Sequence, residues 1–274
     1  MFVCPKCRQA LTKTEKVYAC PNRHSYDRAK EGYVHLLPVN KMHAKIPGDS
    51  KEMVAARRGF LESGGYELFR DALSSLVLEA VGRMESPVIL DAGCGEGYYL
   101  RGVETALEAA GKTPALCGFD ISKFAVKAAA KRQREADFAV ASIFDIPVAD
   151  STVDCLINVF APMVEAEFGR VLKPGGTLVF AVPGERHLYG LKEILYEHPY
   201  ENEHKETDYD GFSFVKRIPV AGELHLTDPE QIRNLFAMTP YYWKTPVAGS
   251  EALARTTRLD TEIQFDFLVY RRTV

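Results

Sequence analysis

The sequence lacks any apolar run of about 18 residues, the length that a membrane-spanning helix needs. Its best apolar stretch, residues 153–166, contains Asp154, Asn158 and Glu165. The N-terminus has no basic segment followed by an apolar one, so we see no secretory signal and expect a cytoplasmic protein with no membrane partner. Internal repeats and low-complexity tracts are also missing. With 274 residues, 46% hydrophobic and 26% charged, the chain is predicted to be globular, with one or two domains.

The sequence has little net charge, −3, but the charge is unevenly distributed. Residues 1–58 hold twelve basic and five acidic side chains and carry +7, whereas the remaining residues carry −10. This division indicates that the basic N-terminal unit binds a polyanion. The acidic body then has a different function. A solvated basic face without a partner is the alternative.

The body of the chain, residues 86–274, alternates apolar strands with amphipathic helices, which is typical of a parallel α/β sheet covered on both faces. We predict a first helix from about Ser50 and further helices over residues 97–110, 122–135, 165–171 and 228–236. Strands are predicted over residues 88–91, 115–119, 137–141, 153–160, 177–182 and 262–270, with a turn at 173–176.

A glycine turn, Asp91-Ala92-Gly93-Cys94-Gly95-Glu96-Gly97, follows the first of these strands and opens a helix. Its G-x-G-x-G spacing is tighter than the dinucleotide fingerprint, so it favours a smaller ligand lying against bare backbone. Asp120 ends the next strand, where an acidic side chain can bind the two hydroxyls of a ribose. A turn that serves packing alone is the alternative.

These features, with the later Leu172-Lys173-Pro174-Gly175-Gly176, resemble the S-adenosylmethionine site of class I methyltransferases. The resemblance implies a Rossmann-like α/β fold with a mixed seven-stranded sheet over residues 86–274. It also places Ser142 near the adenine, although a turn serine explains that residue equally well. Cys94, Cys117 and Cys155 are interpreted as small buried side chains.

A second cluster lies at the N-terminus, where Cys4, Cys7, Cys20 and His24 form the pattern C-x2-C-x12-C-x3-H. Two ligand pairs on two turns suit tetrahedral zinc, and so small a segment needs a metal to fold. A redox C-x-x-C would require a βα context that is missing here, and a reducing compartment disfavours disulfides. We therefore predict a zinc-binding domain over residues 1–36, joined to the body by a basic linker with helices over residues 37–85.

Both parts together, with residues 29–38, 48–61 and 186–188, resemble the RlmA-type family of large-subunit ribosomal RNA guanine-N1 methyltransferases. The resemblance implies methylation of guanine N1 in a hairpin loop of 23S ribosomal RNA, with a zinc domain that recognises RNA, and often a homodimer. One of the family's two branches, which act on neighbouring guanines, is more similar in residues 29–34. The implied cofactor-site residues are Tyr66, Asp91, Gly93, Gly95, Glu96, Gly97, Tyr98, Tyr99, Asp120, Ser142 and His187.

The residue that takes the N1 proton is not identified by the sequence. Asp145, Asn158, Glu165 and His187 are candidates, although His187 also suits a solvated helix start. The segment after the fourth strand of the body matches neither the exocyclic-amine methylation motif nor a cysteine nucleophile, which leaves a ring nitrogen as the target. Tyr33, Phe60, Tyr98 and Phe160 are candidate stacking surfaces, with core packing the better interpretation of Phe60.

Lys41, Lys45, Arg57 and Arg58 are expected to contact RNA phosphates. Two other functions remain open at this point. One is a small-molecule methyltransferase in which the zinc domain only supports the fold, and the other is a non-catalytic protein that binds zinc and RNA.

Overall fold

The computed structural model describes residues 1–38, 40, 47–203 and 208–273. The chain starts with a small sheet of three short antiparallel strands, β1 (Thr12–Lys13), β2 (Val17–Ala19) and β3 (Ser25–Asp27). A fourth short strand, β4 (Val34–His35), leaves this unit and pairs in parallel with β7 (Asp137–Val140) of the main sheet. The N-terminal unit is therefore joined to the body by backbone hydrogen bonds.

In the described residues the main sheet has eight strands in the order β10-β11-β9-β8-β5-β6-β7-β4. The parallel centre holds β5 (Val88–Ala92), β6 (Ala115–Asp120), β7, β8 (Val153–Val159) and β9 (Leu172–Pro183). The antiparallel strands β10 (Phe212–Leu226) and β11 (Leu259–Arg272) complete the expected seven strands, and β4 extends the sheet at its other edge. The class I methyltransferase fold with a mixed sheet is thus confirmed.

The helices follow the predicted pattern for most of the chain. They are α1 (Lys51–Glu62), α2 (Glu67–Val81), α3 (Tyr98–Ala109), α4 (Lys123–Arg132), α5 (Glu165–Val171), α6 (Tyr189–Leu195), α7 (Pro229–Ala237), the 3-10 turn η2 (Pro240–Trp243) and α8 (Val247–Ala254). Ser50, Ser122 and Asp228 cap α1, α4 and α7 through their side chains, as short oxygen-bearing residues do. No helix in the described part of the chain is long and apolar enough to cross a bilayer.

The structure differs from the sequence prediction in α6 and α8, which were not predicted, and in β10, which no pattern indicated. Its alternation is weak, and Pro219 and Gly222 interrupt it, but β10 is an edge strand paired only with β11. Proline is tolerated at such an edge because its missing N–H faces away from the neighbouring strand. The predicted turn at residues 173–176 falls within the bounds of β9, where Gly175 has a φ of +74° and the pairing with β8 changes register.

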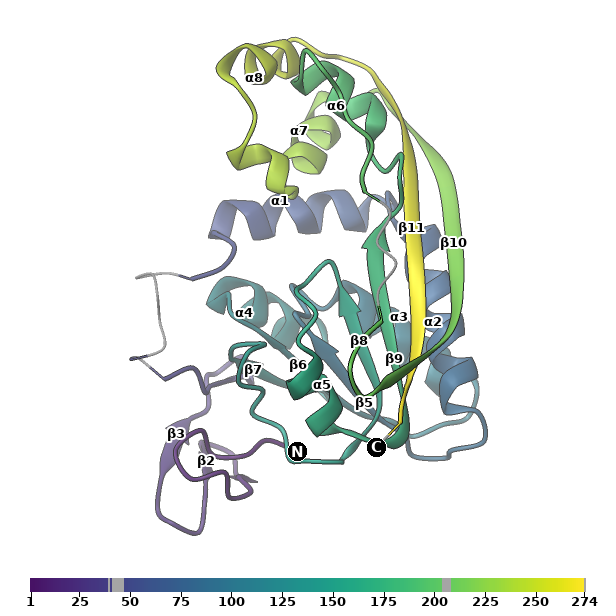
Figure 1. Ribbon diagram of the computed structural model, residues 1–274. Helices are drawn as coiled ribbons and strands as arrows, with labels where there is room; N and C mark the ends of the chain where they lie inside the picture. Colours follow the sequence, from purple (N-terminus) through teal and green to yellow (C-terminus); the bar gives the residue numbers. More distant parts are fainter. Residues whose placement is uncertain (39, 41–46, 204–207, 274) are drawn as a thin grey trace.

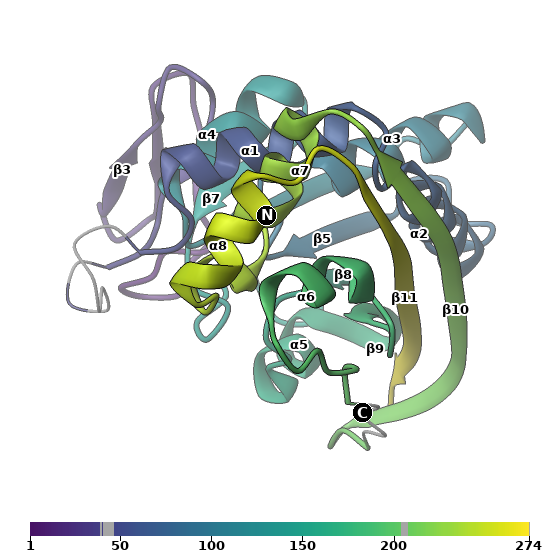
Figure 2. The ribbon, with the colours of Figure 1, turned by 90° about the horizontal axis from the view of Figure 1, so that it is seen from above.

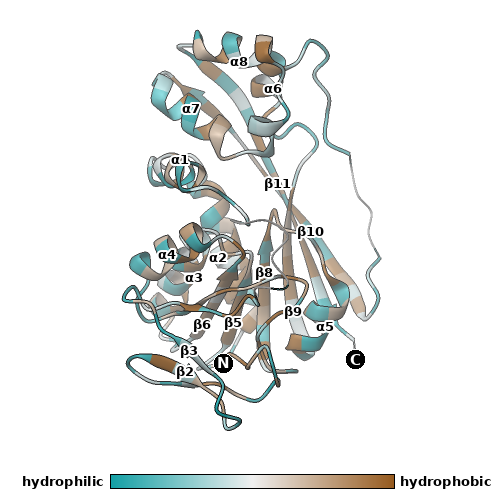
Figure 3. Cartoon of the chain, turned by 90° about the vertical axis from the view of Figure 1, so that its left-hand side faces the viewer, coloured by the Kyte–Doolittle hydropathy of each residue, from teal (hydrophilic) through white to brown (hydrophobic). Residues whose placement is uncertain are grey.

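Two cores form on the two faces of the sheet because successive strand residues point to opposite sides. One face packs against α2, α3 and α4, through residues such as Leu73, Val103 and Val126. The other face packs against α5 and the N-terminal unit, which contributes Phe2 and Tyr18. Figure 3 shows the apolar strands enclosed between helices whose outward faces are polar.

The last helices form a separate layer. Figure 1 shows α6, α7 and α8 above α1, while β10 and β11 run from this layer down to the level of α5 and join the layer to the body. Figure 2, seen from above, shows the same two strands curving around one side. The carboxyl ends of the parallel strands point toward α1 and the upper helices, so a ligand at these ends is covered from above.

Candidate active site and zinc site

The glycine turn joins β5 to α3 in a backbone conformation that only glycine adopts readily. Gly93, Gly95 and Gly97 have φ values of +82°, +53° and +81°. A Cβ on Gly93 would lie 2.8 Å from the Ala161 Cβ, and one on Gly97 would lie 3.1 Å from the Ala129 Cβ. Gly93 and Gly97 therefore allow close packing beneath the turn, whereas Gly95 faces more open space.

Asp120, at the end of β6, holds this turn in place. Its Oδ2 accepts the amide N–H of Gly95 at 3.0 Å, and its Oδ1 accepts the amide N–H of Ser122 at 2.7 Å. The amides of Gly93 and Cys94 both donate to the carbonyl of Phe119 at 2.9 Å. The carboxyl ends of β5 and β6 are consequently fixed against each other.

A cavity of about 660 Å³ opens over the turn, within the usual range for small-molecule sites. Its floor is the glycine turn and the ends of β6, β8 and β9. Its walls come from α1, from the region around His187 and Leu188, and from residues 238–241 after α7. Residues from distant parts of the sequence thus surround one space.

Nine of the eleven predicted cofactor-site residues line this cavity: Tyr66, Asp91, Gly93, Gly95, Glu96, Tyr98, Tyr99, Asp120 and His187. The structure does not bring the other two to its surface. Gly97 packs against α4, and Ser142 accepts the amide N–H of Phe144 at 3.2 Å as a turn serine. Cys94 also lines the cavity, while Cys117 and Cys155 are buried in strands as expected.

The surroundings of Glu96 indicate whether a cationic cofactor suits this cavity. The residue is almost fully buried, and its Oε2 pairs with Arg132 at 2.6 Å. Its Oε1 is buried without a hydrogen-bond partner among the described residues, which is costly unless a ligand supplies a donor. Burial raises the pKa of Glu96, and the Arg132 charge opposes that rise. A cationic donor such as an ammonium group would satisfy this oxygen.

Tyr66 and His187 form a linked pair in the wall. The amide N–H of Gln264 donates to Nδ1 of His187 at 3.1 Å, so the neutral ring carries its proton on Nε2. Nε2 lies 3.2 Å from the Tyr66 hydroxyl and donates to it, which leaves the Tyr66 proton available to another acceptor. Burial and the Lys192 charge lower the pKa of His187 to about 3, so the ring is neutral.

Phe160, just after β8, is the one predicted stacking residue that stays accessible. Phe60, Tyr33 and Tyr98 are at most 6% exposed, whereas Phe160 is 46% exposed and lines the cavity. Its φ of +56° is unfavourable for a bulky residue and costs about 1–3 kcal/mol. Asn158 stabilises this turn, because its side chain accepts from the Ala161 amide and donates to the Pro162 carbonyl.

The structure shows which of the candidate proton acceptors lie at the cavity. Among Asp145, Asn158, Glu165 and His187, only His187 lines the cavity. Its single lone pair is already used by the Gln264 amide, so a neutral His187 offers a proton and does not take one. Asp145 pairs with Arg8 of the N-terminal unit at 3.2 Å, and Glu165 accepts the Asp210 amide N–H.

The basic residues predicted to contact phosphates lie in different surroundings. Lys41 and Lys45 are outside the described residues. Arg58 is about half exposed and pairs with Glu62 on the same helix, whereas Arg57 lines the cavity. Sequence reasoning missed Arg57, Asp49 and Ile121 as cavity residues, because no local pattern reveals that α1 lies over the glycine turn.

The four predicted zinc ligands come together in the N-terminal unit. Their donor atoms all lie within 4.8 Å of one another. The Cys7 and Cys20 sulfurs are 3.7 Å apart, and His24 Nδ1 lies 3.4 Å from the Cys4 sulfur and 3.5 Å from that of Cys20. A zinc tetrahedron with bonds of about 2.3 Å to sulfur and 2.0 Å to nitrogen has edges of about 3.8 and 3.5 Å, so the cluster fits zinc.

The backbone shapes this cluster into two turns, in which the Arg8 amide donates to the Cys4 carbonyl and the Arg23 amide to the Cys20 carbonyl. Arg8 and Arg23 have φ values near +60°, which non-glycine residues seldom adopt. The Tyr26 hydroxyl lies 3.1 Å from the Cys4 sulfur and donates to it. Such a hydrogen bond orients a metal ligand from outside the coordination sphere.

Comparison with known proteins gives two family matches. Residues 2–45 match the family described as RlmA, N-terminal, a zinc ribbon, and residues 85–235 match a methyltransferase domain family. The 23S rRNA (guanine(748)-N(1))-methyltransferase of Streptomyces fradiae is 36% identical over 94% of this chain and 79% of its own length. A candidate 23S rRNA (guanine-N1)-methyltransferase of Micromonospora griseorubida is 37% identical over 70% and 68%. Another, from Bacillus subtilis, is 29% identical over 98% and 96%.

The metal cluster makes a first prediction. Cys7→Ala removes one corner of the tetrahedron, so purified protein should lose about one zinc ion per chain by elemental analysis. Binding of S-adenosylhomocysteine should change by less than about threefold, because the ribbon does not line the cavity. Cys155→Ala, which removes a buried thiol from β8, is the matched control and should keep its zinc. Unchanged zinc content in the Cys7 variant would refute the assignment.

Asp91 makes a second prediction. Burial, together with the Asp120 charge, raises the pKa of Asp91 to about 8, far above its value in the unfolded chain. The protonated form is therefore favoured in the folded protein, and its stabilising contribution disappears as the pH rises toward 8. In urea titrations without ligand, the free energy of unfolding should fall between pH 5 and 8 by about 1 kcal/mol per pH unit. Asp91→Asn should flatten this dependence, while the exposed Asp71→Asn should leave it unchanged.

Proposed function

This chain belongs to the family of 23S rRNA (guanine-N1)-methyltransferases that carry an RlmA-type zinc ribbon, and from that membership we propose that it methylates N1 of one guanine in a hairpin loop of 23S ribosomal RNA. The observation that carries the proposal is the union of the two parts, a zinc ribbon packed on a methyltransferase body whose glycine turn opens into a cavity. Neither a small-molecule enzyme nor a non-catalytic protein accounts for both parts. The S. fradiae relative is named for guanine 748, and we propose the equivalent guanine here.

The cofactor is S-adenosylmethionine, which supplies an electrophilic methyl group when bound. We assign the ribose hydroxyls to Asp120, which keeps free lone pairs beside the two amides that it accepts. The methionine ammonium is assigned to Oε1 of Glu96, for which the described residues supply no hydrogen-bond partner. Tyr66 and the neutral His187 close the wall beside the bound cofactor.

We propose that the target guanine stacks on the ring of Phe160. Methyl transfer needs mainly alignment of the nucleophile with the methyl group and exclusion of water. An exposed aromatic ring in the cavity wall offers a face on which an unstacked base can lie. The edge-to-face packing of Phe160 on Phe265, with ring centres 4.6 Å apart, fixes the orientation of that face.

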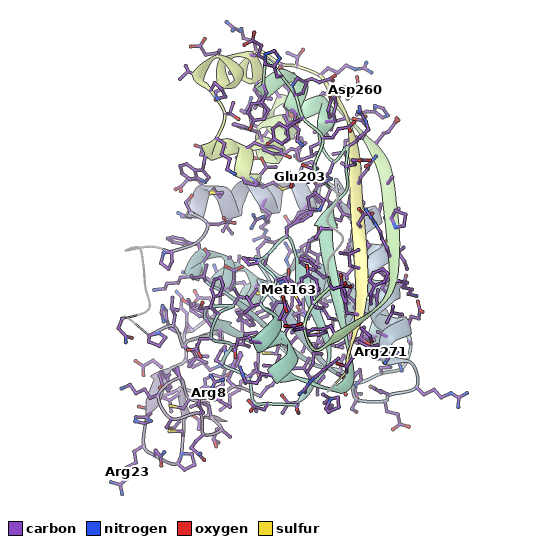
Figure 4. The ribbon with its side chains drawn as sticks, in the orientation of Figure 1. Arg8, Arg23, Met163, Glu203, Asp260 and Arg271 are labelled. Carbon is purple, nitrogen blue, oxygen red and sulfur yellow. The ribbon has the colours of Figure 1, made fainter. Side chains whose placement is uncertain are left out.

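The RNA is expected to extend from the cavity to the zinc ribbon. Lys6, Lys16, Arg23 and Lys30 are exposed on this unit, and Figure 4 shows Arg23 pointing away from the body at its tip. Arg8 and Lys13 instead pair with Asp145 and Asp137 of the body and hold the unit in place. We therefore propose that residues 1–36 bind RNA and that residues 86–274 transfer the methyl group in the cytoplasm. Residues 37–85 connect these two parts and contribute Arg57 and Tyr66 to the cavity. A homodimer, which the resemblance implies, is part of the same proposal.

Primer extension tests the proposed reaction. Ribosomal RNA from cells that lack the gene is incubated with the protein and S-adenosylmethionine, and the product is copied by reverse transcriptase. An N1-methyl group blocks Watson–Crick pairing, so a new stop should appear at one guanine, read first at the position equivalent to 748. A reaction without the cofactor is the control. The absence of a new stop in the RNA would contradict the proposal. Transfer of an isotope-labelled methyl group from the cofactor to a small molecule in its place would favour a small-molecule methyltransferase.

Phe160 provides a further prediction. Phe160→Ala removes the proposed stacking face, and base stacking on an aromatic ring contributes about 1–3 kcal/mol, so kcat/KM for RNA should fall about 10- to 100-fold. Phe160→Trp should keep most of the activity. Binding of S-adenosylhomocysteine, measured by calorimetry, should stay within about threefold in both variants.

Phe214→Ala is the matched control for this series. Phe214 is 53% exposed, but it lies on β10 outside the cavity lining, so its removal should leave kcat/KM unchanged. Equal activity of the Phe160→Ala variant and the wild type would exclude Phe160 as the base platform.

A further inference from the structure

Arg57 lines the cavity, although it belongs to α1 and not to the methyltransferase core. Its side chain is 28% exposed. Nη1 pairs with Asp49 Oδ2 at 2.5 Å, and Nη2 donates to the Met238 carbonyl at 3.2 Å. The guanidinium is therefore held from two sides, by the segment before α1 and by the end of α7.

The guanidinium also lies over the bare backbone of the glycine turn. A Cβ built on Gly95 would have Arg57 Nη1 at 3.7 Å and no other described atom within 4 Å, apart from its chain neighbours. The space above Gly95 is thus bounded by this cation. A ligand that lies against Gly95 would therefore also contact the Arg57 guanidinium.

The charges around the cavity are strongly unbalanced. Its described lining has four carboxyl groups, on Asp49, Asp91, Glu96 and Asp120, but only one arginine or lysine, Arg57. Burial raises the pKa of Asp91 to about 8, so this group is largely protonated at neutral pH and the negative charge comes from the other three. His187 adds no charge, because burial lowers its pKa to about 3. Among the described lining residues, Arg57 is therefore the one cation with which an anionic group of a ligand can pair.

The proposed function supplies such a ligand. S-adenosylmethionine carries a sulfonium, an ammonium and one carboxylate. The first two groups suit the carboxylates of the cavity, and the third requires a cation. We propose that Arg57 binds the α-carboxylate of the methionine moiety, so that the cavity selects adenosyl sulfur compounds that carry an intact amino acid. This inference rests on the proposed use of S-adenosylmethionine.

The hydrogen-bonding capacity of Arg57 agrees with this assignment. A guanidinium has five N–H donors in a planar fork, and Asp49 and Met238 use one each. Three donors remain for a carboxylate, while Asp49 keeps the side chain in place. Arg57 also acts on its neighbours, since burial raises the pKa of Asp120 and of Glu96 and the Arg57 charge opposes both shifts.

The assignment changes the interpretation of the two adjacent arginines. Both were expected to contact RNA phosphates, but they point to different places. Arg58 faces solvent beside Glu62 and keeps the phosphate prediction, whereas Arg57 is committed to the cavity.

The test compares two ligands that differ by one group. Calorimetry with full-length, zinc-loaded protein measures the binding of S-adenosylmethionine and of decarboxylated S-adenosylmethionine, which lacks only the carboxylate. The wild type should prefer the intact cofactor. Arg57→Gln should weaken binding of S-adenosylmethionine about 10- to 100-fold, the effect of losing hydrogen bonds to a charged group, and change binding of the decarboxylated compound by less than threefold.

Arg58→Gln is the matched control and should leave both affinities unchanged. Arg57→Lys keeps the charge but not the fork, so it should retain part of the preference, and it provides the measurement if the glutamine variant does not fold. Equal losses for both ligands, or no loss, would overturn the role of Arg57. If the wild type bound neither ligand, the proposed cofactor itself would fail, which is a different outcome.

Discussion

The hydrogen bonds from Asp120 to the amides of Gly95 and Ser122 are the constraint on which the site depends. They fix the turn after β5 to the turn after β6, at the edge of the sheet where parallel strands present their carboxyl ends. A carboxylate that accepts two amides is costly to move, so the cavity floor is set before any ligand enters. The walls are built on this floor by elements that come from distant parts of the sequence.

The zinc ribbon does more than extend the chain toward a partner. Phe2 and Tyr18 are buried in the same core as Phe119 and Phe168, on the face of the sheet that α5 covers only in part. Lys13 and Tyr18 both reach Asp137 of β7, and β4 adds a parallel strand at this edge. A unit too small to fold by apolar burial alone is thus stabilised both by its metal ligands and by the sheet that it covers.

The chemistry of the cavity follows from which groups have their hydrogen bonds satisfied. His187 uses its lone pair on a backbone amide and its proton on Tyr66, so it acts as a fixed neutral donor. Asn158 uses both ends of its amide to hold the loop that carries Phe160 in a strained conformation. Glu96 keeps one buried oxygen that has no hydrogen-bond partner in the part of the chain that the structure describes. These arrangements favour a site that positions its ligands, with little scope for proton transfer by the residues that sequence alone nominated.

The sequence by itself determined the parallel strands, the glycine turn with Asp120, and the metal quartet, because each depends on spacing within a short stretch of about 30 residues. The central strands appeared where apolar runs predicted them, and the quartet assembled with distances that suit zinc. Only the tertiary structure decided that Arg57 and residues 238–241 meet over Gly95, and that β10 pairs along an edge in spite of its proline. Arg57 and Met238 are 181 positions apart, and the paired residues of β10 and β11 are 33 to 60 positions apart, so local periodicity does not indicate these contacts. The same limit explains why Ser142, chosen by its position after a strand, lies in a turn outside the cavity.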